Sequence, residues 1–296
     1  MEKIGIVILH YLNIKETIAC ISSFLKQDRT NVMIKIVVVD NGSNNGTGKL
    51  LQQKYRENTF VDILLLPNNL GFAKGNNAGL YFLQKKFIPD FVVYSNSDII
   101  FTNESFFDWI LDDYDKYHFS VLGPDVYSIT NNFHQSPCYN LTYKDAKKML
   151  HASLRNYFCI KLLYNCKLFL ILKYIINMQN KRKKHSKILA PDYRKSSNQF
   201  TLHGSLLVFS SDFYKYFPEG LFDKTFLYVE ENILKLYCDI THLNMVYDSN
   251  YSVNHVQAAS TSLVCKDEYK HKLFRLKYII ESLKCYINLC KKYRYH

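Results

Sequence analysis

An acidic residue follows a short apolar run in Phe91-Val92-Val93-Tyr94-Ser95-Asn96-Ser97-Asp98. The run predicts a buried strand, and ligands of open α/β sheets bind beyond the carboxyl ends of the strands. A carboxylate at that edge, with an Asn two residues before it, suits a divalent cation that carries a substrate diphosphate. The alternative is that Asn96 and Asp98 only shape a turn and cap a helix that starts near Thr102.

Two further segments place polar residues where a nucleotide could bind. Asp40 ends a second apolar run, before an Asn, Gly and Ser-rich turn at 41–47, and its carboxylate can accept a hydrogen bond from a base or ribose. The glycines of residues 69–79 allow a close backbone approach to an anion, and Lys74 adds a point charge for phosphate. Helix capping and helix packing explain the same residues without a ligand.

A third cluster lies in the second half of the chain. Glu230 and Glu231 follow the aromatic-rich residues 222–229, and His255 follows a predicted strand that ends near residue 253. One of the two carboxylates could act as a general base, and a neutral imidazole can bind a manganese-type ion. The alternatives are two acids that complement a helix dipole and a histidine with a structural role.

The spacing of apolar runs indicates how these residues are positioned. Runs rich in Ile and Val recur about 30 residues apart, and helix-like stretches lie between them. This alternation predicts an α/β fold with a doubly wound, mainly parallel sheet. We expect strands at 4–9, 34–39, 61–66, 91–94, 201–209 and 243–247, helices at 15–27, 48–55 and 73–87, and a further helix capped by Thr102 or Asn103.

The chain has 296 residues and a net charge of +12, and two segments carry the whole basic excess. Residues 141–200 hold 14 Lys and Arg against 2 acids, and residues 263–296 hold 9 against 3. We expect a domain at 1–262 with a basic helical insertion at about 141–200, and an amphipathic helical tail at 263–296. Both basic segments suit an anionic lipid surface or a solvated helix face. The acidic remainder and the lack of a zinc, homeodomain or RNA-binding motif argue against nucleic acid.

Cysteine spacing and hydropathy indicate the compartment. The 8 cysteines show no Cys-x-x-Cys spacing, which favours reduced thiols in a cytosol. The first apolar run is too short for a signal peptide, and no stretch approaches the roughly 18 apolar residues of a membrane span. We therefore expect a cytoplasmic protein. The basic insertion and tail further suggest peripheral contact with the inner face of the cell membrane, and the alternatives are a dimer interface or a helical cover over the acceptor cleft.

Taken in order, these motifs resemble the family 2 glycosyltransferases, especially their rhamnosyltransferase-like branch. The resemblance covers roughly residues 3–140 and 200–262 and implies the GT-A fold, a Rossmann-like sheet flanked by helices. It implies inverting transfer from a nucleoside-diphosphate sugar, dTDP-rhamnose or a UDP-hexose, with Mn²⁺ or Mg²⁺ as cofactor. The implied acceptor is a hydroxyl of a growing, lipid-linked glycan in surface polysaccharide synthesis. The sequence does not determine the oligomeric state, and an oligomer is one of the possibilities.

The resemblance also implies roles for individual residues. Glu231 takes the place of the catalytic base, and Asp98 and His255 take the places of the metal ligands. The nucleotide-sugar site would comprise Leu9, His10, Tyr11, Asp40, Gly71, Lys74, Asn76, Asn96, Ser97 and Asp98, and the acceptor side His203, Gly204 and Glu230.

The chain departs from the family pattern at several of these positions. Asn96 replaces the first Asp of the family's Asp-x-Asp motif, and Glu231 replaces a more usual Asp. Ile233 and Tyr237 stand where an Asp and an Arg commonly follow. The departures motivate an alternative, a non-catalytic nucleotide-sugar or glycan-binding protein of the same fold. A nucleotidyltransferase on a related sheet is a further alternative.

Overall fold

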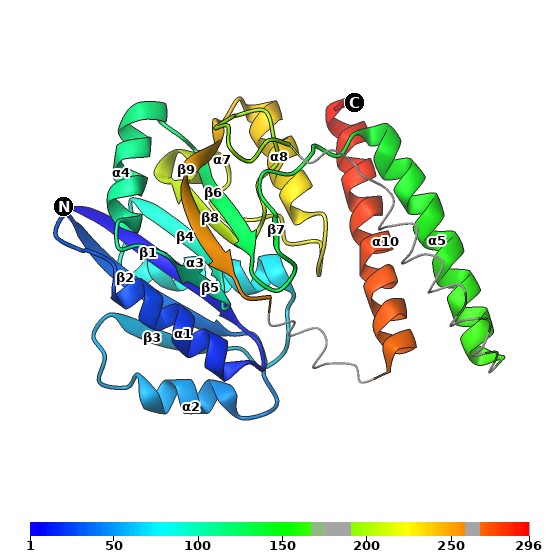
Figure 1. The fold of residues 1–296 in the computed structure, drawn as a ribbon, viewed down its shortest axis with the longest axis horizontal. Helices are drawn as coiled ribbons and strands as arrows, with labels where there is room; N and C mark the ends of the chain where they lie inside the picture. Colours follow the sequence, from blue (N-terminus) through cyan, green and yellow to red (C-terminus); the bar gives the residue numbers. More distant parts are fainter. Residues whose placement is uncertain (167, 169–170, 172–173, 175–190, 258–266, 296) are drawn as a thin grey trace.

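The computed structural model describes residues 1–166, 168, 171, 174, 191–257 and 267–295 (Figure 1). The strands are β1 (Glu2–His10), β2 (Val32–Asp40), β3 (Val61–Leu65), β4 (Phe91–Asn96), β5 (Ile99–Phe101), β6 (Val121–Ser128), β7 (Phe133–His134), β8 (Leu206–Ser210) and β9 (Met245–His255). The helices are α1 (Ile14–Leu25), α2 (Thr47–Lys54), α3 (Phe72–Lys86), α4 (Phe106–Tyr117), α5 (Tyr143–Asn165), α7 (Ser211–Tyr216), α8 (Glu230–Thr241) and α10 (Glu268–Tyr293).

One sheet with the strand order β3-β2-β1-β4-β8-β6-β9-β5 forms the centre of the molecule, and β7 pairs with β6. The first four strands in this order are parallel, as the alternating strand and helix signals predict. Beyond β4 the sheet becomes mixed, because β8 runs antiparallel to both β4 and β6. The parallel part brings the carboxyl ends of β1, β2 and β4 to one edge.

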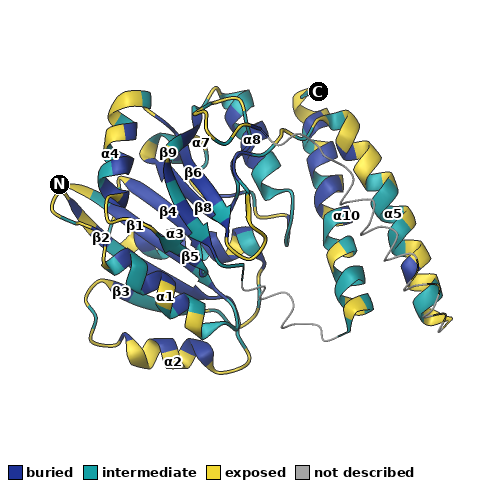
Figure 2. Cartoon of the chain, viewed as in Figure 1, coloured by how far each residue is buried: buried dark blue, intermediate teal, exposed yellow. Residues whose placement is uncertain are grey.

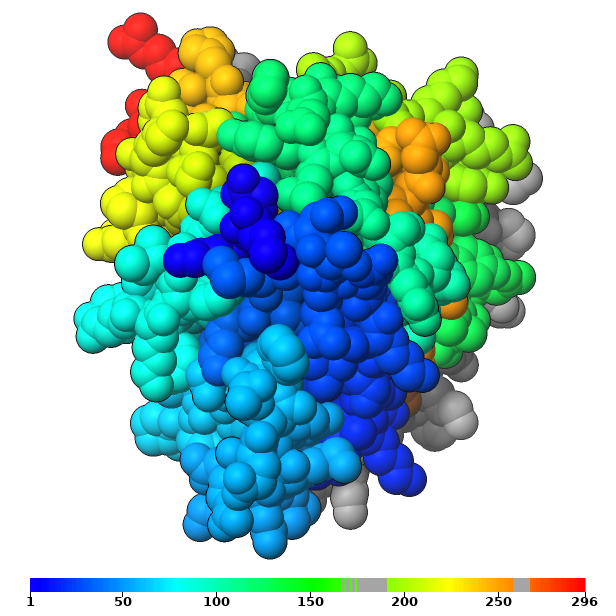
Figure 3. Space-filling model, turned by 90° about the vertical axis from the view of Figure 1, so that its left-hand side faces the viewer, coloured from blue at the N-terminus to red at the C-terminus, as the bar shows by residue number. Residues whose placement is uncertain are grey.

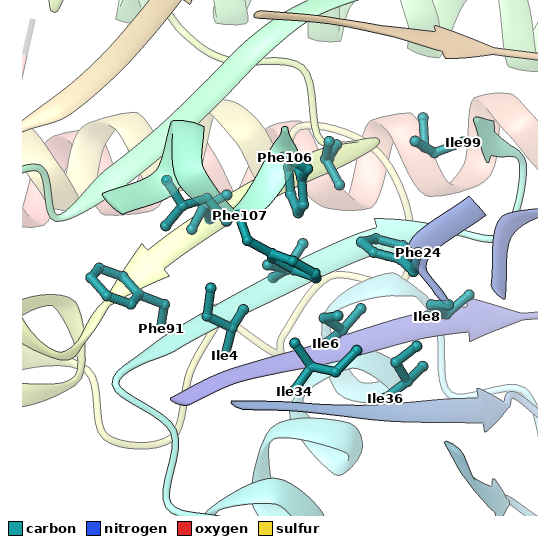
Figure 4. Close-up of a cluster of buried hydrophobic side chains, with 14 of the residues drawn as sticks. Ile4, Ile6, Ile8, Phe24, Ile34, Ile36, Phe91, Ile99, Phe106 and Phe107 are labelled. Atoms are coloured by element: carbon teal, nitrogen blue, oxygen red, sulfur yellow. The ribbon is translucent and has the colours of Figure 1, made fainter. Parts of the chain in front are cut away.

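Helices cover both faces of the sheet, so its central strands are buried on both sides. Ile4, Ile6 and Ile8 of β1 pack with Phe24 of α1 and Phe106 of α4 on one face (Figure 4). The alternate residues of the same strands pack against α3, α7 and α8 on the other face. Figure 2 shows the resulting buried layer, and Figure 3 shows the first third of the chain as a continuous outer surface below that of α4.

The basic insertion and the tail form a helix pair beside the sheet. Leu283, Tyr286 and Ile287 of α10 pack with Ala146 of α5 and Ile233 of α8, so that α10 lies between the other two helices (Figure 1). Lys181-Arg182-Lys183-Lys184 of the basic insertion and the start of the tail at 263–266 lie outside the described residues. Among the helices that are described, none combines the length and apolarity that crossing a membrane requires. The described cysteines are free thiols.

Several predicted boundaries are wrong. The helix after Asp98 begins only after Ser105, because the short strand β5 comes first and pairs with β9. The strand expected from residue 201 begins at Leu206, and the one expected at 243–247 continues through the predicted strand region to His255. Strand β6 was not predicted, since Pro124 in its centre argues against a strand; the register shift between Pro124 and Asp125 accommodates this proline.

Candidate active site

A cavity of about 810 Å³ lies beyond the carboxyl ends of β1, β2 and β4. Strand ends and the loops after them form one side of it, and a segment before α8 together with one residue of α10 forms another. The lining residues are Leu9, Tyr11, Asn41, Asn69, Gly71, Phe72, Asn96, Ser97, Asp98, Thr130, Asn131, Phe226, Leu227, Tyr228, His255, Gln257 and Phe274. Seven residues that the sequence places in the site, Leu9, Tyr11, Gly71, Asn96, Ser97, Asp98 and His255, are among them.

Asn41 holds the loop after β3 against the end of β2. Its Nδ2 donates hydrogen bonds to the Gly71 carbonyl (3.0 Å) and to Asn69 Oδ1 (3.1 Å), and its Oδ1 accepts one from the Leu70 N–H (2.9 Å). Sequence reasoning did not select Asn41 as a site residue. Its position directly after the strand-ending acid, in the segment Val39-Asp40-Asn41-Gly42-Ser43 that resembles the family, is the sequence signal that could have indicated it.

Gly71 lies where that loop meets the segment before α8. Its φ of +85° lies in the left-handed region, and a Cβ built on it would come within 2.4 Å of the Phe226 carbonyl oxygen. The next residue, Phe72, donates its N–H to the same oxygen at 2.9 Å. Any side chain at position 71 must therefore displace the backbone that connects the two walls of the cavity.

His10 and Asp40 lie near the cavity but do not line it. His10 is fully buried, and both of its ring nitrogens are within hydrogen-bond distance of threonine hydroxyls. Nδ1 lies 2.7 Å from Thr17 Oγ1, and Nε2 lies 2.9 Å from Thr47 Oγ1. Burial lowers the pKa of His10, against the opposing effect of the Asp40 carboxylate. Asp40 accepts the Ser43 N–H at 3.0 Å and is 5% exposed. Direct contacts of His10 and Asp40 with a nucleotide remain predictions.

Lys74 and Asn76 of α3 do not line the cavity either. Lys74 is exposed, whereas Asn76 is fully buried and donates from Nδ2 to the Phe72 carbonyl at 3.0 Å. Lys74 follows Phe72 by two residues and so faces a different side of the helix, whereas Asn76, one turn after Phe72, is held by its bond to the Phe72 carbonyl. Their predicted nucleotide contacts are therefore without support from the cavity lining.

The pairing of β5 with β9 brings Asp98 and His255 together. In that antiparallel pair Ile99 is opposite His255, and the Val256 N–H donates to the Asp98 carbonyl at 3.0 Å. The two side chains meet as a result, with Asp98 Oδ1 3.1 Å from His255 Nε2. Asn96 ends β4 beside them and also lines the cavity.

This pair fits a cation of the Mg²⁺ or Mn²⁺ type. Two adjacent ligands in an octahedron with bonds of about 2.1 Å lie about 3.0 Å apart, close to the 3.1 Å between Asp98 Oδ1 and His255 Nε2. In the part of the chain that the structure describes, no group of three or more His, Cys, Asp or Glu side chains is arranged to hold a metal. The remaining ligands would have to be oxygens of a diphosphate and water, as is usual for Mg²⁺.

The loop before β8 places a neutral imidazole beside this pair. His203 Nδ1 accepts the Ser205 N–H at 3.3 Å, so the ring hydrogen is on Nε2. Burial lowers the pKa of His203 to about 4, and the nearby His255 acts in the same direction. The two rings lie with centroids 5.8 Å apart. His203 is therefore uncharged near neutral pH and presents a hydrogen-bond donor.

Glu231 lies behind this loop, at the start of α8. A Cβ built on Gly204 would come within 2.8 Å of Glu231 Oε1, so the glycine leaves space for the carboxylate. Burial raises the pKa of Glu231, while N–H donors of its own backbone and of Gly204 oppose the shift. Glu231 and the predicted acceptor residues His203 and Gly204 are adjacent to one another but are not among the cavity-lining residues.

The second acid of the pair, Glu230, faces a different environment. It borders a small cavity with Phe222, Leu234 and Tyr237, and burial, followed by the charge of Glu231, raises its pKa to about 8. The acidic pair therefore does not act as a unit on one cavity. Its predicted place on the acceptor side stays a prediction.

The backbone that leads into α8 is strained. Tyr228 and Val229 both have positive φ values, 73° and 69°. Such values are rare for residues with a side chain, above all for a β-branched one, and strain of this kind concentrates at functional sites. The strained pair directly precedes both acids, and Tyr228 itself lines the cavity.

A sequence model described as "Glycosyl transferase family 2" matches residues 5–170. A comparison with curated proteins found no significant match. The matched range includes the strands and loops that supply Leu9, Asn41, Gly71 and Asp98.

Solved glycosyltransferase structures share the fold at low sequence identity. The crystal structure of S. aureus TarS 1-349 has 14% identity and a TM-score of 0.53, over 98% of this chain and 73% of that one. The same protein in complex with UDP-GlcNAc has 15% identity and a TM-score of 0.53, over 97% and 73%. GalNAc-T7 with UDP, GalNAc and Mn²⁺ has 12% identity and a TM-score of 0.60, over 99% of this chain and 50% of that one. The predicted GT-A fold is confirmed.

Proposed function

The chain belongs to glycosyl transferase family 2, and from that premise we propose that it is an inverting enzyme. It moves a sugar from a nucleoside-diphosphate donor to a hydroxyl of a glycan. The observation that carries this proposal is the pair Asp98 and His255, 3.1 Å apart in a cavity next to Glu231 and its loop. Nucleotide, cation and acceptor groups would meet there.

In the proposed reaction Glu231 has one role, and the pair Asp98 and His255 has another. Glu231 takes the proton of the acceptor hydroxyl, whose oxygen bonds to the anomeric carbon from the face opposite the diphosphate. The bond from that carbon to the diphosphate oxygen breaks, and the nucleoside diphosphate leaves with the electron pair. Asp98 and His255 would hold Mn²⁺ or Mg²⁺, which offsets the charge of the leaving diphosphate. Burial, which raises the pKa of Glu231, makes it a stronger base.

Two observations suggest the donor. The TarS structures include UDP and UDP-GlcNAc complexes, and GalNAc-T7 was solved with UDP and GalNAc. A UDP-hexose or UDP-N-acetylhexosamine is therefore our first candidate, and dTDP-rhamnose, which the rhamnosyltransferase-like motifs suggest, is the second. The proposed acceptor is a growing lipid-linked glycan in surface polysaccharide synthesis.

A donor screen tests the proposed function directly. Thermal shift and slow donor hydrolysis would be measured for UDP-glucose, UDP-galactose, UDP-GlcNAc, UDP-GalNAc and dTDP-rhamnose, each with Mn²⁺ and with EDTA. We expect one nucleotide class to stabilise the protein and to be hydrolysed only with the metal. If no nucleotide sugar binds under either condition, the proposal is wrong. If one binds without hydrolysis or transfer, the alternative of a non-catalytic nucleotide-sugar-binding protein is favoured, as the departures at Asn96 and Ile233 suggest.

The outer face of α5 supports a second, finer proposal, that the enzyme works on the inner surface of the cell membrane. Phe158 and Leu162 are 63% and 64% exposed, one helical turn apart. Lys144 and Arg155 extend the same stripe toward the helix start and are exposed. Basic residues next to exposed apolar ones suit an anionic lipid surface, where a lipid-linked acceptor would also lie.

Vesicle flotation tests this membrane contact. The protein should float with vesicles of phosphatidylglycerol and phosphatidylcholine but not with phosphatidylcholine alone, and salt should weaken the association. Replacing both Phe158 and Leu162 with Ser should lower the partitioning at least about tenfold, or about 1.4 kcal/mol, because their burial in the interface is lost. Tyr81→Ser, which removes a 60% exposed side chain on α3, is the matched control. Flotation that is absent or insensitive to salt would contradict the membrane role.

A further inference from the structure

Gln135, in the turn after β7, reaches the histidine of the proposed cation site. Its Oε1 lies 2.7 Å from Nδ1 of His255, a residue that is only 6% exposed. The other ring nitrogen of His255 faces Asp98. Gln135 does not line the cavity, and neither the motifs nor the family resemblance indicated it.

The contact determines which nitrogen of His255 carries the hydrogen. A carbonyl oxygen can only accept, so Nδ1 at 2.7 Å from Gln135 Oε1 is the donor. In the neutral ring, the lone pair of Nε2 is then directed at Asp98 Oδ1, 3.1 Å away. Two electron-pair donors at this separation repel each other unless a cation lies between them, so this tautomer is the one that suits a metal ion.

The backbone of Gln135 is fixed on two sides. Its N–H donates to the Val126 carbonyl of β6 at 2.7 Å, and its own carbonyl accepts the Cys138 Sγ–H at 3.0 Å. The neighbouring Ser136 Oγ accepts the His203 N–H at 3.3 Å. Hydrogen bonds thus hold the turn both to the sheet and to the loop that carries His203. They fix the backbone from which the Gln135 side chain extends.

We propose that Gln135 is a positioning residue that holds His255 in the Nδ1–H tautomer and so directs Nε2 to the divalent cation. The inference rests on the proposed function, since the cation site of Asp98 and His255 belongs to it. Partners of this kind orient metal-binding histidines, and their loss commonly lowers metal affinity 10- to 100-fold. An uncharged amide does this without adding a further negative charge beside the diphosphate.

Metal binding in three variants tests the role without relying on turnover. Mn²⁺ would be titrated into the protein with UDP, and free Mn²⁺ would be followed by its electron paramagnetic resonance signal. Gln135→Leu should weaken Mn²⁺ binding about 10- to 100-fold. Gln135→Glu keeps an acceptor at the same reach and should restore affinity to within about threefold. Gln53→Leu, the same substitution at an exposed position of α2, should leave it unchanged.

A spectroscopic measurement separates positioning from a general loss of structure. Long-range ¹H–¹⁵N spectra of the imidazoles, recorded with Mg²⁺ and UDP, should show His255 as the Nδ1–H tautomer in the wild type and in Gln135→Glu. The Leu variant should lose this pattern while His203 keeps its own. Wild-type affinity in Gln135→Leu, or an Nε2–H tautomer in the wild type, would overturn the inference and leave the cation site standing. A wild type that binds no Mn²⁺ would instead refute the cation site itself, and this role with it.

Discussion

Replacing Glu231 with Gln should lower sugar transfer about 10²- to 10⁴-fold and leave UDP binding within about twofold of the wild type. The amide has the shape of the carboxylate and can still accept the Gly204 N–H, but it cannot take a proton from the acceptor hydroxyl. Transfer would be measured with the donor that the screen identifies, and UDP affinity by calorimetry. Loss of turnover without loss of donor binding is the expected result for a base that acts on the acceptor.

The pH dependence of sugar transfer is a second test of Glu231 as the general base. A general base acts only when deprotonated, so wild-type transfer should rise with pH through the pKa of Glu231, which burial raises above the usual carboxyl value. This rising limb should disappear in Glu231→Gln. Glu219→Gln, at an exposed carboxylate, is the control and should retain both the wild-type transfer rate and its rise with pH. Near-normal turnover in Glu231→Gln would show that another group is the base.

The parallel half of the sheet was predictable from local sequence, because β1, β2 and β4 are largely buried on both faces and appear as continuous apolar runs. Strand β6 was not predictable, since a proline such as Pro124 argues against a strand unless the register is irregular, as it is here with β9. Strand β5 is equally hidden: three residues long, it exists because β9 pairs with it. Each of these strands pairs with β9 through residues more than 100 positions away, which no local pattern shows.

The candidate site divides in the same way. Asp98 could be predicted because a strand end carries it to the edge where ligands bind. Lys74 and Asn76 share a motif with Gly71, but Lys74 faces a different side of α3 from the cavity-lining Phe72, and Asn76 is buried in a hydrogen bond to the Phe72 carbonyl. Gln135 and Phe274 reach the site from a turn and from the distant α10, and only tertiary packing brings them there.

Replacing Asp98 with Ala should abolish most of the metal dependence of donor binding. In Mn²⁺ we expect UDP affinity to fall more than about 100-fold, because loss of a direct ligand exceeds the 10- to 100-fold cost of losing an outer partner. In EDTA the affinity should change less than about threefold, since the proposed nucleotide contacts of Leu9, Tyr11 and Gly71 do not depend on the Asp98 carboxylate. Calorimetry with UDP under both conditions measures the difference.

Comparing UDP affinity in Mn²⁺ with that in EDTA separates the loss of a metal ligand from the loss of the fold. A variant that had lost its fold would bind UDP poorly in both, whereas a variant that had lost only a ligand would bind poorly only in Mn²⁺. Asp115→Ala removes an exposed carboxylate of α4 and should retain the full effect of the metal. If Asp98→Ala bound UDP in Mn²⁺ as well as the wild type does, Asp98 would not be a ligand. Its pairing with His255 Nε2 would then be an ordinary ion pair that closes the β5–β9 edge.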